Sequence, residues 1–461
     1  NLRKKCERLL DVPFDSDRKM FTTLNKIDDN VYVLCKGSMD SLIEKVNLSK
    51  TQKEEVLDKV KNFSKNALRT LGFAYKKLDY VPKNIKELEK EENNLSFAGI
   101  LGMIDPPRKS VKESVALCKN AGIRPIMITG DGIDTATTIA KDVGIITSDN
   151  EAILGSELDK YNDKELEDIV KKYSVYARVN PTHKEKIVFA LQSSGKIVAM
   201  TGDGVNDAPA IKDAHVGVGM GITGTDVTKS ASDIVLMDDS FSTIVVAIEE
   251  GRRIYNNIRN NIVFSLSSNF AEIFTIIIGL FTKTTILLPI YILFIDLVTD
   301  SIPSICLSFE KSEDGIMKKK PRGINKQLFT PFIKASIAFS AIIETLFVVL
   351  TYFISLKMYG QETAMSLALL SMVIQEIVYS LSCRNLKQSV VKQGLFSNKA
   401  MNYGLLLIIL IELIVFITPV GKLISVTSIN ISLILVVFLI NFMAIFIYEL
   451  IKPLLVKCFK D

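Results

Sequence analysis

The chain has 461 residues, 48% of them hydrophobic, and a formal net charge of +5 at pH 7. This length exceeds what one hydrophobic core can organise and predicts two to four domains. Residues 1–260 carry as many acidic as basic residues, so the positive excess lies in residues 261–461, beside apolar segments. The balance excludes a basic domain for binding nucleic acid. Six scattered cysteines without a CxxC pair, and only two histidines, argue against a zinc site.

Residues 1–95 alternate short apolar runs with charged, helix-periodic segments, which predicts a domain of mixed strands and helices. Residues 31–35 and 71–75 are predicted to be strands, and residues 53–71 an amphipathic helix. The chain starts at Asn1 within a basic segment, without an initiator methionine or a signal peptide. We therefore expect it to be a piece of a longer protein.

Residues 96–250 have a different pattern, in which short buried strands are followed by polar loops and helices. The strands are predicted at residues 97–104, 124–128 and 196–200. Such alternation favours an α/β domain with a doubly wound parallel sheet, whose ligands bind at the carboxyl ends of the strands. The predicted domain boundaries are therefore near residues 95 and 250.

The loop at residues 201–209 follows one of these strands and carries two carboxylates, Asp203 and Asp207, four residues apart. A short sequence of this kind, taken alone, would more often be a simple turn. Adjacent glycines let the backbone approach a ligand, and paired carboxylates suit a hard cation such as Mg²⁺, to which Asn206 can add a neutral oxygen. Further side chains suited to a phosphoryl group are Thr129, Gly130 and Asp131, which follow the predicted strand at 124–128, and Arg178 and Lys184.

Residues 251–461 contain six hydrophobic runs long enough to cross a bilayer. The runs lie at about residues 262–281, 287–307, 332–356, 363–382, 403–420 and 429–450. An even number of spans leaves both chain ends on one side, and lysine and arginine concentrate in the loops of that side. By the positive-inside rule, we expect an integral protein of the cell membrane whose soluble domains and chain ends are cytoplasmic.

Polar side chains recur on one predicted face of each of the first two spans. Asn269 and Glu272 lie three residues apart, and Asp296, Thr299 and Asp300 have i, i+3 and i+4 spacing. Carboxylates inside a membrane are costly, so their presence indicates a function. Oxygen ligands of this kind suit Ca²⁺, Na⁺ or K⁺ better than soft transition metals.

The loop residues of the soluble part together resemble the phosphatase-like domain of the haloacid dehalogenase superfamily. The longer string GDGVNDAPAIKDAHVGVGMG, with DPPR at residues 105–108, is similar to the P-type ATPases, and the resemblance covers nearly the whole chain. It implies an α/β, haloacid dehalogenase-like (Rossmannoid) phosphorylation domain at 96–250. It also implies a partial α+β nucleotide-binding domain at 1–95 and a stalk with a six-helix transmembrane domain at 251–461.

The resemblance also implies a nucleotide site. Lys36 and Gly37 are similar to the start of the family's KGA sequence, in which serine here replaces alanine. Other positions correspond to an adenine-stacking aromatic residue and to basic phosphate contacts: Phe14, Lys19 and Arg69. The implied cofactors are ATP and Mg²⁺, and the implied partners are the lipid bilayer and a transported cation.

In this family, ATP phosphorylates an aspartate in a DKTGT motif, and the phosphorylation drives ion transport. The motif does not occur in this sequence, so we expect it upstream, with the actuator domain and the first four membrane helices. The chain alone is then expected not to hydrolyse ATP, because the phosphoryl acceptor is missing. The alternatives are a membrane-anchored phosphatase, and an inactive chain that serves as a binding or regulatory subunit.

Within the family, the transported ion is expected to be Ca²⁺. The strings SSNFAE and LVTD resemble the calcium-pump branch, but Asp296 in DLVTD is similar to sodium/potassium pumps, so a Na⁺, K⁺ or H⁺ pump is the alternative. Three carboxylates around a divalent ion leave a formal charge of −1. A monovalent ion would leave −2, which is costlier in a low dielectric.

Four other residues of the spans are ambiguous. A loose alignment puts Cys383 where two-site calcium pumps have glutamate, which predicts a single cation site unless Glu376 compensates. Glu344 and Glu412 have no partner motif, so packing or interfacial roles are equally expected.

Overall fold

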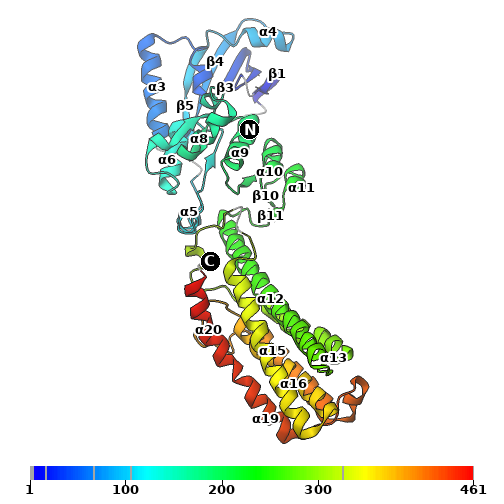
Figure 1. The fold of residues 1–461 in the computed structure, drawn as a ribbon. Coiled ribbons are helices and arrows are strands. Elements are labelled where there is room, and N and C mark those ends of the chain that lie inside the picture. The colour runs from blue at the N-terminus through cyan, green and yellow to red at the C-terminus, as the bar shows by residue number, and fades with distance from the viewer. Residues whose placement is uncertain (1–4, 16–17, 66–67, 104–105, 324–326, 460–461) are drawn as a thin grey trace. The chain divides into compact units, whose positions relative to one another are not determined.

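The computed structural model describes residues 5–15, 18–65, 68–103, 106–323 and 327–459. The chain divides into two compact units, one of Asn1–Val245 with Met317–Ile324, the other of Val246–Ile316 with Asn325–Asp461. The first unit contains all the described strands, and the second is helical (Figure 1).

The amino-terminal part of the first unit is an antiparallel sheet of five strands in the order β1-β2-β3-β4-β5. Alternation along β3 buries Val33 and Cys35 on the core face and leaves Lys36 exposed on the other. The core is closed by apolar side chains of two short helices, including Leu42 and Leu88. The elements are β1 (Cys6–Asp15), β2 (Met20–Ile27), β3 (Asn30–Gly37), α2 (Met39–Leu42), α3 (Lys50–Lys65), β4 (Arg69–Leu78), α4 (Ile85–Lys90) and β5 (Ser96–Met103).

The fifth strand, β5, differs from our expectation that it would open the second domain. It pairs antiparallel with β4, from Arg69 opposite Met103 to Tyr75 opposite Ser96. The backbone ladder holds this segment in the first sheet, so the change of architecture comes after residue 103. Asp105 of the DPPR string lies outside the described residues.

The rest of the first unit alternates strands and helices, as predicted, but its strands form two parallel sheets. Their orders are β6-β8-β7 and β11-β10-β9, and among the described residues no backbone ladder joins β6 to β9. The single doubly wound sheet that we expected is therefore not formed. The elements are α5 (Ser110–Asn120), β6 (Met127–Ile128), α6 (Ile133–Asp142), β7 (Ala152–Leu154), α7 (Gly155–Leu158), α8 (Asp163–Lys172), β8 (Val175–Ala177), α9 (Pro181–Ser193), β9 (Ala199–Gly202), η2 (Val205–Asp207), α10 (Ala208–Asp213), β10 (Val216–Met220), α11 (Asp226–Ala231) and β11 (Ile234–Leu236).

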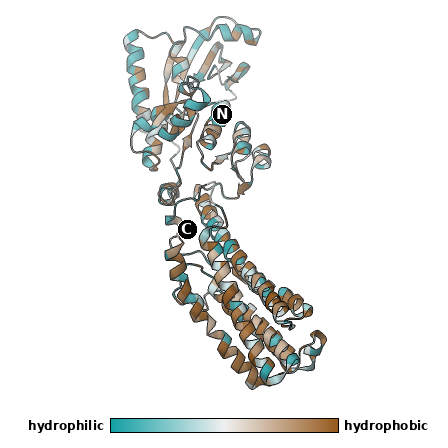
Figure 2. Ribbon diagram, viewed as in Figure 1, coloured by the Kyte–Doolittle hydropathy of each residue, from teal (hydrophilic) through white to brown (hydrophobic). Residues whose placement is uncertain are grey.

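Six segments of the described chain are long and apolar enough to cross a membrane, which confirms the six predicted spans. Figure 2 shows their hydrophobic residues along α12 to α20. The segments are Phe241–Thr282, Pro289–Ser308, Pro331–Tyr359, Gln361–Cys383, Lys399–Ile417 and Ile431–Cys458. They correspond to α12 (Phe241–Thr282), α13 (Pro289–Phe294) with η3 (Ile295–Asp300) and α14 (Ser301–Ser308), α15 (Pro331–Tyr359), α16 (Gln361–Cys383), α18 (Lys399–Ile417), and α19 (Ile431–Phe442) with α20 (Ala444–Cys458).

Helix α12 contains the first predicted span and begins well before it. It runs without interruption for 42 residues, which corresponds to about 63 Å at 1.5 Å per residue. A hydrocarbon core is only about 30 Å thick, so much of α12 extends beyond it.

Helix α16 is the central helix of the second unit. Its apolar window is 89% buried, against 28–44% for the other five spans. Side chains of α16 are therefore placed to meet those of several other helices.

The second span contains a π-helical segment, η3, between two α-helical pieces. Pro303 follows in α14 and has no amide hydrogen to donate to the carbonyl of Thr299. Asp296, Thr299 and Asp300 were predicted to share one helical face, but Thr299 and Asp300 are buried while Asp296 is exposed. The wider π turn accounts for this difference, since it rotates Asp296 away from the other two residues.

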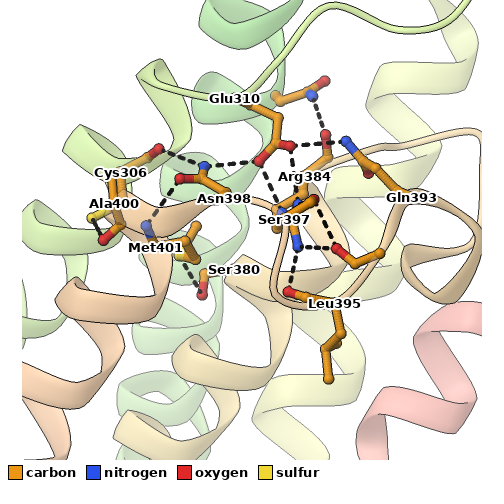
Figure 3. Close-up of polar contacts among 12 residues, drawn as sticks. Cys306, Glu310, Ser380, Arg384, Gln393, Leu395, Ser397, Asn398, Ala400 and Met401 are labelled. Carbon is orange, nitrogen blue, oxygen red and sulfur yellow. Dashed lines mark hydrogen bonds and ion pairs between the residues drawn. The ribbon is translucent and has the colours of Figure 1, made fainter.

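A buried ion pair connects the places where α14 and α16 end and α18 begins (Figure 3). Glu310 follows α14, and Arg384 caps the carboxyl end of α16. Asn398, the N-cap of α18, donates to Glu310 Oε2 at 2.8 Å and to the carbonyl oxygen of Cys306 at 3.1 Å. The pair thus fixes three connections of the second unit to one another.

Candidate functional site

Candidate catalytic residues of the first unit lie after the carboxyl ends of three parallel strands, two of which were predicted and one of which, β8, was not. Thr129 follows β6, Arg178 follows β8 and Asp203 follows β9. Two main-chain hydrogen bonds join the first two of these loops, from Arg178 N to Asp131 O at 2.9 Å and from Val179 N to Thr129 O at 3.1 Å. The two loops therefore form one connected surface.

The loop of Thr129, Gly130 and Asp131 is held by its own side chains. The Thr129 hydroxyl donates to Asp131 Oδ2 at 3.2 Å and accepts from the Asp131 amide at 3.1 Å. Gly130 is exposed, and a Cβ added there would meet no atom within 4 Å. The glycine leaves the backbone open to an approaching ligand and is not required by packing.

Lys184 and Asp207 form the close contact of this site. Lys184 lies in the first turn of α9, and its Nζ donates to Oδ1 of the buried Asp207. The Gly204 amide donates to the other carboxylate oxygen at 3.3 Å. A Cβ at Gly202 would lie 2.5 Å from the Asp207 Cβ, so Gly202 leaves the space that Asp207 occupies.

The candidate magnesium ligands differ in their surroundings. Asp203 and Asn206 are exposed, whereas Asp207 is buried and bound to Lys184. Among the described residues, no three acidic, histidine or cysteine side chains are grouped to hold a metal ion. Two carboxylates and an amide still fit Mg²⁺, which keeps several waters and takes one or two protein carboxylates.

The candidate nucleotide residues lie at one end of the antiparallel sheet. Asp15 at the end of β1 pairs with Met20 at the start of β2, and the same end holds the close of β3 and the start of β4. The Phe14 side chain is 63% exposed, so its ring is open to solvent. The structure brings these candidates to this end: Phe14, Lys19, Lys36, Gly37 and Arg69.

Gly37 allows this end of the sheet to close around Lys19. A Cβ at Gly37 would lie 2.6 Å from Met20 Cγ and 2.8 Å from the Lys19 carbonyl oxygen. The neighbouring Lys36 is exposed, with its Nζ 5.1 Å from the centre of the Phe21 ring. A basic group and an aromatic face are therefore adjacent on the open side of the strand.

Two ion pairs connect the nucleotide end to the candidate catalytic loops within the first unit. Arg69 Nε lies 3.8 Å from Asp131 Oδ1, and Arg178 donates to Asp40. Arg178 has a φ of 52°, a left-handed conformation that is uncommon for a residue with a side chain. Exposed pairs of this kind add little stability, so their main effect is to orient the two arginines.

The predicted transport residues of the second unit are brought together only in part. Glu272 and Asp300 are buried, and Glu272 lies within electrostatic range of both Asp296 and Asp300. Oε1 of Glu272 and Oδ1 of Asp300 have no hydrogen-bond partner in the described part of the chain. Asn269 and Asp296 are exposed, on a side of the helices that the described residues do not cover.

Two glutamates of this cluster were not among the predicted site residues. Glu376 on α16 is buried, and its carboxylate accepts from the Ser268 hydroxyl at 2.9 Å and from the Thr299 hydroxyl. Glu344 on α15 is also buried, within electrostatic range of Asp300 and Glu272. Their position in predicted spans was a usable signal, since a carboxylate in a membrane indicates function.

Glu376, and not Cys383, is the residue of α16 that contacts the cluster. Cys383 is the last residue of α16, seven residues beyond Glu376, or about 10 Å along the helix. The hydrogen bonds from Ser268 and Thr299 go to Glu376, which is therefore the residue of α16 at the cluster. Glu376 is thus placed to compensate for Cys383, the alternative that the sequence left open.

Comparisons with known proteins match both units. A family model described as "P-type ATPase, cytoplasmic domain N" matches residues 1–110, and one described as "Cation transporting ATPase, C-terminus" matches residues 284–454. The chain is 39% identical to calcium-transporting ATPase 1 of Bacillus cereus over 480 aligned residues, which cover 98% of this chain and 54% of the relative.

Two further relatives are named for the transport of different ions, calcium and potassium. The calcium-transporting ATPase of Bacillus subtilis is 37% identical over 421 residues, covering 88% of this chain and 47% of the relative. The human potassium-transporting ATPase alpha chain 2 is 33% identical over 499 residues, covering 90% of this chain and 48% of the relative. The chain thus spans about half the length of the curated relatives it matches.

Proposed function

Since this chain belongs to the P-type cation-transporting ATPase family, we propose that it forms part of a pump that uses ATP to move Ca²⁺ across a membrane. The pump would work through an aspartyl-phosphate. The observation that carries the proposal is the buried pair of Glu272 and Asp300, each with an oxygen that lacks a hydrogen-bond partner. Buried carboxylates of this kind call for a cation or a proton.

Calcium is the proposed ion because hard oxygen ligands and a high density of negative charge suit a divalent ion. The names of the two Bacillus relatives agree with this choice. Asn269, Glu272, Asp296, Thr299 and Asp300 are the proposed ligands. Asn269 and Asp296 are exposed in this chain, so oxygens from elsewhere in the pump would complete the shell on their side.

A Na⁺, K⁺ or H⁺ pump is the alternative that specific observations favour. Asp296 adds a carboxylate where an amide is usual in calcium pumps, and the human relative is named a potassium-transporting ATPase. An inactive chain with a binding or regulatory role is the second alternative. Ion-dependent phosphorylation separates all three, because an inactive chain gives no phosphoenzyme with any ion.

We assign the two parts of the soluble unit to the two steps of phosphorylation. The antiparallel part, with Phe14, Lys36 and Arg69, would bind ATP. The parallel part would be the phosphorylation domain of haloacid dehalogenase type, in which Thr129 and Lys184 hold the phosphoryl group. The ion pair between Arg69 and Asp131 supports an approach of one part to the other.

Mg²⁺ would be held by Asp203, assisted by Asp207, and would neutralise charge on the phosphoryl group. In the complete pump, Asp203→Asn is expected to abolish phosphoenzyme formation while calcium binding in the membrane persists. Asp134→Asn, an exposed aspartate in the first turn of α6, is the matched control. Normal phosphoenzyme in Asp203→Asn would remove Asp203 from the magnesium site.

The orientation is proposed from charge alone. Lysine and arginine concentrate in the loops after the second, fourth and sixth spans. The positive-inside rule then places these loops, the soluble unit and both chain ends in the cytoplasm. Protease digestion of sealed vesicles of known orientation would test this placement.

The proposed function is tested by transport. Membrane vesicles that contain the full-length protein are expected to accumulate calcium when ATP and Mg²⁺ are added. Accumulation should be lost in Glu272→Gln and retained in Glu412→Gln, a glutamate of α18 outside the cluster. Vesicles that hydrolyse ATP without moving calcium would contradict the proposal.

A further inference from the structure

Four buried carboxylate oxygens near one another in the second unit have no hydrogen-bond partner among the described residues. They are Oε1 of Glu272, Oδ1 of Asp300, and both oxygens of Glu344. An unpaired buried carboxylate oxygen is expensive, so a native structure keeps one where a ligand supplies the missing interaction. Glu344 is the extreme case, because its side chain is fully buried and neither oxygen is satisfied.

The position of Glu344 is fixed by its neighbour in the sequence. The Thr345 hydroxyl donates to the Ala271 carbonyl oxygen at 3.3 Å, which joins α15 to α12 directly beside Glu272. The Glu344 carboxylate lies within electrostatic range of Asp300 and Glu272. Three helical segments, α12, η3 and α15, therefore direct carboxylates into one region.

Two other buried glutamates show that this arrangement is particular to Glu344. Glu376 receives hydroxyl hydrogen bonds on both carboxylate oxygens, from Ser268 and Thr299, and so has partners within the protein. Glu412 on α18 is buried and unpartnered, but no charged group among the described residues lies within range of it. Among the described residues, only Glu344 combines two unpartnered oxygens with neighbouring carboxylates.

We propose that Glu344 is a ligand of the transported cation, and that Glu272, Asp300 and Glu344 bind a divalent ion through carboxylate oxygens. The inference deepens the proposed function and rests on it. Around one divalent ion these three carboxylates leave a formal charge of −1, and the exposed Asp296 brings the charge to −2, which a bound proton would reduce again to −1.

Closure of this site requires a side-chain movement. No three acidic groups of the described residues now surround a common point. Glu344 is suited to turn toward an entering ion, because no hydrogen bond holds either of its oxygens. Ca²⁺ accepts irregular shells of about six to eight oxygens, whereas Mg²⁺ demands a near-ideal octahedron, so a shell completed by rotation favours the larger ion.

The experiment compares three variants of the full-length protein in detergent, by equilibrium calcium binding and by the rise in melting temperature that calcium causes. Glu344→Gln keeps the shape and removes the charge. Glu344→Asp keeps the charge and shortens the reach. Glu412→Gln removes another buried and unpartnered carboxylate, from outside the cluster. Melting in a calcium chelator reports folding separately, and Glu344→Gln should melt no lower than the wild type there.

Glu344→Gln is expected to weaken calcium binding by at least about tenfold, Glu344→Asp by less, and Glu412→Gln by less than about twofold. A folded Glu344→Gln protein with calcium affinity within about twofold of the wild type would overturn the proposal. Should the wild type bind Na⁺ or K⁺ and no calcium, the calcium assignment fails. The same titration with that ion then decides whether Glu344 is a ligand.

Discussion

Arg384 and Glu310 form a two-point ion pair in which both side chains are buried. Arg384 Nε donates to Glu310 Oε2 at 2.8 Å, and Nη2 donates to Oε1 at 3.0 Å. The remaining Arg384 donors reach the carbonyl oxygens of Gly394 and Leu395 and the hydroxyl of Ser397. Loss of any one of these acceptors would leave a buried, charged N–H group without a hydrogen bond, which is costly in free energy.

Arg384→Met is expected to destabilise the second unit by about 3–5 kcal/mol, because it leaves the Glu310 carboxylate buried without its partner. Arg384→Lys should also destabilise, since lysine cannot reproduce the two-point geometry. The measurement is thermal unfolding in detergent, with Lys392→Met as an exposed nearby control. If Arg384→Met melts like the control, the pair does not hold the three connections together.

The same pair reaches the long helix α12 through the Glu310 backbone. Arg253 Nη1 and Asn257 Nδ2 each donate to the Glu310 carbonyl oxygen at 2.9 Å. The carboxylate cluster also begins on α12, at Glu272. One helix therefore carries both the buried hub and part of the candidate cation site.

The Asp207 side chain depends on the absence of a side chain at Gly202. Gly202→Ala would place a methyl group 2.5 Å from the Asp207 Cβ, which must displace the carboxylate from Lys184. We expect phosphoenzyme formation in the complete pump to fall at least about tenfold, as for a misplaced electrostatic group. Gly132→Ala is the matched control, because its added Cβ would meet no atom within 4 Å. Equal loss in both variants would mean that Asp207 is not the cause.

Asp300 and Asp296 are expected to respond differently to the same substitution. Asp300 is buried at the centre of the cluster, whereas Asp296 is exposed. Asp300→Asn should therefore abolish calcium-dependent phosphorylation by ATP, and Asp296→Asn should only raise the calcium concentration required. Calcium titration of phosphoenzyme formation measures both. Equal effects of Asp300→Asn and Asp296→Asn would show that the difference in burial between the two side chains does not decide their roles.

Asp239 gives the soluble unit a pH dependence with a definite sign. Hydrogen bonds from the Ile222 amide at 3.0 Å and the Thr223 amide at 2.7 Å lower the pKa of Asp239 to about 2. The pKa of Asp239 in the folded state lies below the ordinary value of about 4. The ionised Asp239 side chain therefore stabilises the folded state above pH 4, and this stabilisation is lost between about pH 4 and 2. Arg108 supports the same loop by donating to the Asp239 carbonyl oxygen at 2.9 Å.

Asp239→Asn should therefore lower the melting temperature at neutral pH, and the difference from the wild type should shrink as the pH falls toward 2. Asp134→Asn, which changes an exposed aspartate of α6, is the control. A difference that is constant with pH would show that Asp239 acts through packing and not through its charge.

The sequence predicted those features that depend on local pattern. Apolar runs are sufficient to locate six spans, and polar residues after predicted strands are sufficient to find Thr129 and Asp203. The pairing of β5 with β4 could not be predicted, because strand partners are set by tertiary contacts that leave little local signal. The division of the parallel strands into two sheets has the same origin.

The membrane cluster shows a second limit. Helical spacing placed Asp296 and Asp300 on one face, but the π turn in η3 separates them in burial. Glu344 and Glu376 join the cluster because α15 and α16 turn those faces toward α12. The spacing of apolar residues within one helix does not show how that helix is rotated about its axis relative to its neighbours. The candidate sites were thus found where one helix or loop defines them, and missed where packing does.

The ion dependence of phosphoenzyme formation tests the central claim most directly. The full-length protein is incubated with labelled ATP and Mg²⁺, and the acid-stable phosphoprotein is measured with calcium, sodium or potassium added over a chelator. We expect micromolar calcium to produce phosphoenzyme, and sodium and potassium to produce none in its absence. Phosphoenzyme that requires sodium or potassium and ignores calcium would contradict the calcium assignment, and no phosphoenzyme with any ion would contradict the pump.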